Sequence, residues 1–166
     1  MKLYQIEKKV MRYLFLFVCI FISSSSFCFG EAAFHGKLAM IEQSEFIAIV
    51  DISKVEPAKE KRNGWIYSEV ALATVEETIK GSLPKNVKLY GGENFICAQV
   101  RYKPGRYLVF LRRDKELLSG VNWHLGVRAI KENKVDWFVD DKKLELKESP
   151  LPVVLTEIKK LVSAKK

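Results

Sequence analysis

The sequence predicts a mainly β fold: a small closed barrel of about five strands, with a short N-terminal helix and a C-terminal amphipathic helix. Three observations predict this class. Gly, Pro and Asn punctuate the chain roughly every ten to fifteen residues, as turns do between short strands. The segments between them alternate apolar and polar side chains. The longest of these, 65–79, changes phase at Val75, which indicates a β-bulge and the strong bend that closes a small barrel.

The first half of the chain contains the expected short helix and three expected strands. Apolar residues at helical spacing predict the helix within 34–43. Alternating side chains over 46–55 predict the first strand, and the polar segment 57–64 predicts a loop. The bent strand 65–79 follows, and a shorter strand is expected around 87–89, before a pair of glycines.

The second half predicts a central strand, a hairpin and a final helix. Residues 107–112 are apolar on both faces, as in a strand buried on both sides. Residues 125–130 and 135–139 are expected to pair as a hairpin. Ser149 is the expected N-cap of an amphipathic helix that ends in lysines. Such a helix could lie on a membrane, but we expect it to pack over one end of the barrel.

The N-terminal thirty residues have the layout of a secretory signal peptide. Basic residues precede an unbroken apolar run at 13–22, and small and polar residues follow it. This run is shorter than the ~20 residues that span a bilayer. We therefore expect 1–30 to be removed and 31–166 to be exported, to the periplasm or outside the cell, as one domain without a transmembrane span. An uncleaved N-terminal anchor is the alternative, and translation from Met1 or from Met11 is left open.

Cysteine content and charge limit what the exported domain can be. Removal of the signal would leave Cys97 as its one cysteine, so no internal disulfide could form. The apolar neighbours of Cys97 predict a buried structural thiol rather than a reactive or intermolecular one. The full chain has a formal net charge of +8, and much of this positive charge lies outside the signal. Such a balance favours anionic partners and does not by itself indicate nucleic acid.

Three short motifs carry a resemblance to a known family. They are Ile-Lys-Gly at 79–81, Gly-Gly at 91–92, and Pro-Gly-Arg-Tyr-Leu-Val-Phe-Leu at 104–111, preceded by the strand at 46–55. This order resembles the exported bacterial relatives of the netrin-like domain, whose best known members are the tissue inhibitors of metalloproteinases. The resemblance covers roughly residues 40–130 and implies an OB-type barrel. The inhibitors present a disulfide-tied N-terminal cysteine to the protease zinc, which this sequence lacks, so inhibition is not carried over.

An enzymatic site has little support in the sequence. His35, His124 and Cys97 are the candidates for nucleophile, base or metal ligand, and their spacing matches no metal motif. Cys97 with His124 could form a thiol and its base, but no cysteine-protease signature surrounds either residue. We therefore expect no enzyme, no cofactor and no metal. A small hydrolase or an inhibitor-like protein, acting through Cys97 and His124 or through an N-terminal segment, is the alternative.

The sequence instead favours a non-catalytic binding module that acts outside the cytoplasm. OB-type barrels bind through the face of their middle strands and the adjacent loops. Cations and aromatic side chains gather in two such places, and the candidate binding residues are Lys59, Lys61, Arg62, Trp65, Tyr67, Arg101, Tyr102 and Lys103. Trp65 and Tyr67 could instead pack inside a strand. We expect a monomer whose partner is a protein or an anionic envelope or glycan surface, not a nucleic acid.

Overall fold

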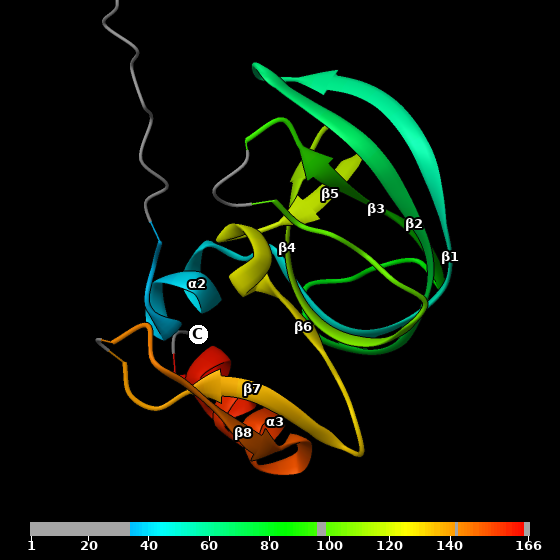
Figure 1. Ribbon diagram of the computed structural model, residues 1–166. Coiled ribbons are helices and arrows are strands. Elements are labelled where there is room, and N and C mark those ends of the chain that lie inside the picture. Colours follow the sequence, from blue (N-terminus) through cyan, green and yellow to red (C-terminus); the bar gives the residue numbers. More distant parts are fainter. Residues whose placement is uncertain (1–33, 96–98, 142, 165–166) are drawn as a thin grey trace, which may run out of the picture. The chain divides into compact units, whose positions relative to one another are not determined.

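The computed structural model describes residues 34–95, 99–141 and 143–164 (Figure 1). The expected signal peptide at 1–30 and Cys97 lie outside these residues. From Phe34 onward the described residues belong to one compact unit. Within them, no helix is long and apolar enough to cross a membrane.

Five strands are joined by hydrogen bonds into a closed ring. This ring is the cyan to yellow-green part of the ribbon in Figure 1. They are β1 (Phe46–Arg62), β2 (Trp65–Lys80), β3 (Asn86–Glu93), β4 (Gly105–Asp114) and β5 (Leu117–Gly120). Around the ring the order is β1-β2-β3-β5-β4, and β4 pairs back onto β1. The β3–β5 pair is parallel and the other four are antiparallel. The predicted mainly β class is confirmed.

The β1–β2 hairpin is longer than the sequence predicts. β1 runs to Arg62, which pairs with Trp65 across a two-residue turn, so the loop expected at 57–64 is wrong. The turn residues Asn63 and Gly64 have φ of 46° and 83°. Asn-Gly is the pair that a tight hairpin turn with two positive φ angles favours, and its twist matches that of the flanking strands.

The bulge predicted near Val75 is confirmed. Ile49 of β1 faces Glu77, whereas the next residue, Val50, faces Val75. One residue of β2, Glu76, is therefore left without a partner at this point. Such an extra residue bends the strand and increases its twist, which lets the long hairpin curve around the ring.

The predicted pairing of 125–130 with 135–139 is wrong. β6 (Val127–Ala129) adds to β4, and β7 (Lys134–Phe138) pairs instead with β8 (Leu146–Pro150) in a second, two-stranded sheet. A single bridge between Lys131 and Lys134 is what remains of the expected hairpin. β6 forms its backbone hydrogen bonds with the edge of β4 instead of with β7. The sequence alone does not reveal that these two pairings compete.

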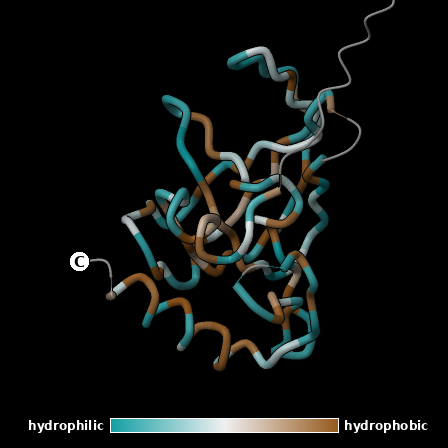
Figure 2. Tube along the Cα trace, turned by 90° about the vertical axis from the view of Figure 1, so that its left-hand side faces the viewer, coloured by the Kyte–Doolittle hydropathy of each residue, from teal (hydrophilic) through white to brown (hydrophobic). Residues whose placement is uncertain are grey.

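Among the described residues, two α-helices pack with the strands, α2 (Lys37–Gln43) and α3 (Leu151–Ser163). The predicted C-terminal helix is confirmed, and apolar and polar residues alternate along it in Figure 2. Its N-cap is Pro150 and not Ser149, whose hydroxyl donates to the carbonyl of Lys147. Pro suits a helix start because no backbone N–H is needed there. α2 is tied to α3 by an ion pair between the buried Lys37 and Glu157.

β4 separates two hydrophobic cores. Val109 belongs to the cluster inside the ring, with Val50 and Leu89. Its neighbour Phe110 belongs to a second cluster and stacks on Trp137 of β7 at a centroid distance of 5.8 Å. Successive residues of a strand point to opposite faces, so the unbroken apolar run in β4 serves both clusters. The prediction of a central strand at 107–112 is therefore confirmed.

Candidate functional site

Three aromatic side chains from separate segments meet near the base of the β1–β2 hairpin turn. We call Trp65, Phe95 and Trp123 the aromatic cluster. The ring centroid of Trp123 lies 4.8 Å from that of Trp65 and 5.8 Å from that of Phe95, and Trp65 and Phe95 are 5.8 Å apart. All three are half-buried, so each keeps some surface open to solvent. Partly exposed aromatic side chains of this kind are frequent anchors in binding sites.

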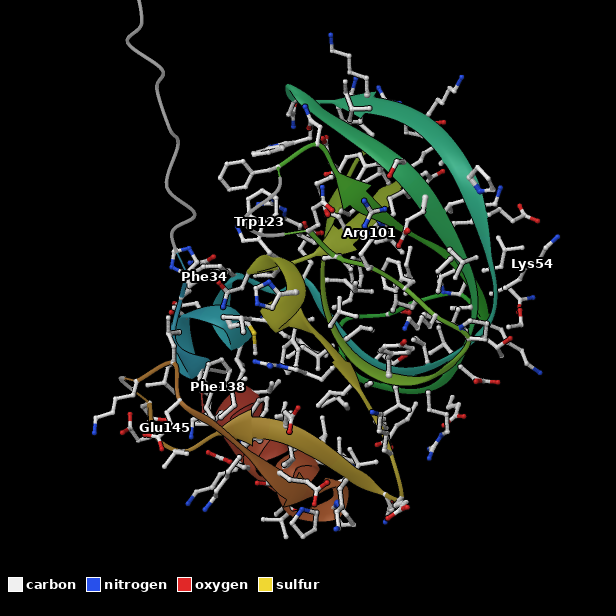
Figure 3. All side chains as sticks on the ribbon, viewed as in Figure 1. Phe34, Lys54, Arg101, Trp123, Phe138 and Glu145 are labelled. Carbon is white, nitrogen blue, oxygen red and sulfur yellow. The ribbon has the colours of Figure 1, made fainter. Side chains whose placement is uncertain are left out.

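Trp123 reaches the aromatic cluster from a strained backbone. It begins the short 3-10 helix η2 (Trp123–Gly126) and is labelled in Figure 3. Asn122 and Trp123 have φ of 62° and 56°. The left-handed region is unfavourable for a bulky residue such as Trp, and such outliers persist only where surrounding contacts enforce them. One such contact is backbone packing at Gly126, where a Cβ would lie 1.8 Å from the carbonyl oxygen of Val121.

The segment before α2 supplies further contacts to this turn. The buried Asn122 side chain accepts a hydrogen bond from the backbone N–H of His35 at 2.8 Å and donates one to its carbonyl at 2.7 Å. Phe34 stands edge-on to His124, with 5.4 Å between ring centroids. Burial lowers the pKa of His124, and the charge of Arg128 adds to this effect. The imidazole of His124 is therefore mainly neutral at pH 7.

The hairpin turn is also tied to the turn between β4 and β5. The Nδ2 atom of Asn63 donates a hydrogen bond to Oδ2 of Asp114 at 2.7 Å. Exposed cations surround this junction on both turns, namely Lys59, Lys61, Arg62, Arg112 and Lys115. Arg62 pairs directly with Trp65, so the basic turn continues into the aromatic cluster. We call Lys59, Lys61 and Arg62 the basic hairpin.

The structure separates the binding residues that the sequence suggested. Arg62 lies directly opposite Trp65, whereas Lys61 pairs with Ile66 and so points to the other face of the hairpin. Tyr67 and Tyr102 are each only 5% exposed and line the core inside the ring, so the prediction that they lie on a binding surface is wrong. Arg101 and Lys103 are exposed, but Arg101 is held at another point of β2, by an ion pair with Glu69 at 3.2 Å.

A buried polar network holds the segment 99–103 against β2 and β3. Glu93 accepts a hydrogen bond from the N–H of Val100 at 2.8 Å, and Glu69 accepts one from the N–H of Tyr102 at 2.7 Å. Burial raises the pKa of Glu93, although two backbone hydrogen bonds act against it. Burial also raises the pKa of Tyr102, and the charges of Glu93 and Glu69 add to it. These bonds give the segment a structural role.

Of the residues considered for catalysis or metal binding, His35 and His124 belong to no group of potential metal ligands in the described part of the chain. Among residues 34–95, 99–141 and 143–164, no three His, Cys, Asp or Glu side chains are grouped so that they could hold a metal ion. Cys97, the candidate thiol, lies outside these ranges. Within the described part of the chain, His124 is exposed and its ring contacts Phe34.

Comparisons with known proteins add no assignment, because no protein-family model, curated protein or solved structure matches the chain. The function is therefore argued from the arrangement of the aromatic cluster and the basic hairpin. Sequence reasoning missed Phe95 and Trp123, which reach Trp65 only through the fold. The Asn63-Gly64 pair was the available signal for the tight turn that places Arg62 opposite Trp65.

Proposed function

We propose that this chain is an exported, non-catalytic binding module built on an OB-type barrel of the netrin-like kind. The ring order β1-β2-β3-β5-β4, with one parallel pair, supports the OB-type assignment, since that barrel has five strands in a Greek-key order. Two motif glycines, Gly81 and Gly92, have φ of 75° and 66°, which explains why glycine stands there. Support for export comes from the signal-like segment at 1–30.

The proposed binding surface consists of the aromatic cluster and the basic hairpin. One observation supports this surface most strongly. The backbone of Trp123 is left-handed, and its ring centroid lies 4.8 Å from that of Trp65. Strain of this kind costs on the order of 1–3 kcal/mol and is concentrated at functional sites. The surface includes the turn between the first two strands and borders the turn between the fourth and fifth, the two loops through which OB-type barrels bind.

The partner that fits this surface is an acidic macromolecule of the cell envelope. Exposed Lys and Arg side chains attract anions over a distance that salt shortens to about 10 Å at 0.1 M. The aromatic side chains would supply contact area that salt does not weaken. Binding should therefore fall as salt rises, without vanishing.

The experiment measures binding of the mature protein to three acidic probes: alginate, phosphatidylglycerol vesicles and polyglutamate. Dextran, phosphatidylcholine vesicles and polyglutamine are the neutral controls. We expect one acidic probe to bind at low salt, and substitution of Lys59, Lys61 and Arg62 by Ala to weaken it about tenfold or more. The matched control removes three exposed lysines elsewhere, Lys143, Lys147 and Lys160, and should bind like the wild type.

Equal binding by the hairpin variant and the wild type would contradict the proposed surface. Chemical turnover of a bound probe would contradict the non-catalytic part of the proposal. Intact-mass measurement of protein from the native host tests export separately, and full-length protein in the cytoplasm would contradict it.

A further inference from the structure

The turn of the β1–β2 hairpin carries an asparagine that is directly followed by glycine, Asn63-Gly64, and no other Asn-Gly pair occurs in the sequence. Both residues are exposed, and a Cβ built on Gly64 would meet no atom within 4 Å, so the described residues leave the turn open. The side-chain carbonyl carbon of an asparagine can reach the backbone nitrogen of the next residue. A glycine at that position has no side chain to block the approach.

The backbone of this turn can adopt the geometry that brings these two atoms together. Asn63 and Gly64 have φ of 46° and 83°, the two positive φ angles of a type I′ turn. Rotation of the peptide plane between them gives a type II′ turn, in which only the first central residue keeps a positive φ. Glycine accepts both signs of φ, and both turn types fit a two-residue hairpin, so the strands can keep their pairing during this rotation.

We propose that Asn63 is a site of spontaneous deamidation. The backbone nitrogen of Gly64 attacks Cγ of Asn63 and closes a succinimide ring. The side-chain amide leaves as ammonia and takes the proton that the attacking nitrogen gives up. Water then opens the ring at either of its two carbonyl carbons, so the products are aspartate and isoaspartate. The reaction consumes only water.

Deamidation removes the contact that the Asn63 side chain makes. Its Nδ2 atom donates a hydrogen bond to Oδ2 of Asp114 at 2.7 Å, which ties the hairpin turn to the turn between β4 and β5. An aspartate at this position has no side-chain N–H to donate, and it places a second carboxylate against that of Asp114. Two like charges this close repel each other, so the reaction separates the two turns. This chemistry does not depend on binding at the aromatic cluster or the basic hairpin.

Incubation of the purified protein in mildly alkaline buffer tests the reaction, because the attacking nitrogen must lose its proton. We expect a form with one more negative charge in ion-exchange chromatography, and peptide mass mapping should place the change from amide to acid at Asn63. Asn133 is the internal control. It also has a positive φ in a turn, 59°, but Lys134 follows it and donates its N–H to the carbonyl of Lys131 at 2.8 Å. Asn133 should keep its amide.

Asn63→Asp reproduces one product and tests its effect on the turn. Arg62 and Trp65 pair across the turn, and hydrogen exchange of their backbone N–H groups should become about tenfold faster in this variant. Adding Asp114→Asn exchanges the two side-chain groups, so that an amide can again donate to a carboxylate. Exchange in the double variant should return to nearly the wild-type rate.

Retention of the amide at Asn63, under conditions in which a peptide of residues 60–67 deamidates completely, would overturn the proposal. Equal reaction at Asn63 and Asn133 would overturn the part assigned to the glycine and the open turn. Wild-type hydrogen exchange in Asn63→Asp would overturn the separation of the two turns, because the bond to Asp114 would then not hold the hairpin turn in place.

Discussion

Asn122 holds the backbone of His35 through two hydrogen bonds, one accepted at 2.8 Å and one donated at 2.7 Å. The two residues are far apart in the sequence. The side-chain amide of Asn122 bonds to both the N–H and the carbonyl of His35, as the backbone of a neighbouring strand would. Because Asn122 directly precedes Trp123 and shares its left-handed backbone, this pairing fixes the turn that carries Trp123 into the aromatic cluster.

Replacing Asn122 by Ala should therefore destabilise the protein and loosen the aromatic cluster. Ala loses both hydrogen bonds and disfavours the left-handed conformation, a combined cost of about 2–4 kcal/mol in the free energy of unfolding. Asn122→Gly relieves the backbone strain and should lose less. Urea denaturation, followed by tryptophan fluorescence, measures both. Equal stability of the Ala variant and the wild type would show that the pairing does not support the turn.

The part of β1 beyond Ile52 is an open strand edge, and this leads to a second prediction. β1 pairs with β4 over 46–52, and beyond Ile52 the described residues place only β2 beside it. Pro57, Lys59 and Lys61 lie on this edge, and Pro and Lys are residues that prevent edge strands from pairing with other molecules. Replacing all three by Thr should cause concentration-dependent association in sedimentation experiments. The variant with three Thr at Lys143, Lys147 and Lys160 should remain like the wild type; association of both variants alike would contradict a specific edge effect.

Glu93 predicts a pH dependence of stability. Burial raises the pKa of this carboxyl in the folded state, so folding favours its protonated form. Below the unfolded-state pKa of about 4.3 the carboxyl is protonated in both states, so it does not reduce the free energy of unfolding. As pH rises through the folded-state pKa, the buried carboxyl ionises and the free energy of unfolding falls. Glu93→Gln keeps an acceptor for the N–H of Val100 and cannot ionise. Its stability relative to the wild type should increase from pH 4 to pH 7.5, as measured by urea denaturation.

The control for that comparison is Glu60→Gln, at an exposed position of β1. Its stability difference from the wild type should change little with pH. A difference for Glu93→Gln that is flat over the same pH range would contradict the role of burial.

Local patterns predicted the elements of this fold better than their partners. The alternation in β2, the apolar run in β4 and the bulge near Val75 all follow from side-chain period alone. The choice of β8 over β6 as partner of β7 depends on which strand reaches the edge of β4, and that is a property of the whole chain. β8 itself is short and polar and has no strand-like alternation.

The candidate site was partly predictable for the same reason. Basic residues beside Trp65 are visible in the sequence, whereas Phe95 and Trp123 join them only through long-range folding. The burial of Tyr67 could have been predicted, because Tyr67 shares a face of β2 with Ala71 and Ala73, which fill the interior of the ring.

Quenching of tryptophan fluorescence by acrylamide tests most directly whether a partner covers the aromatic cluster. The chain has 3 tryptophans, and Trp137 is only 3% exposed, so the accessible signal comes mainly from Trp65 and Trp123. A saturating amount of the acidic probe that binds should protect these two side chains and lower the quenching constant. An unchanged quenching constant at full occupancy would contradict the proposal that the partner binds on the aromatic cluster.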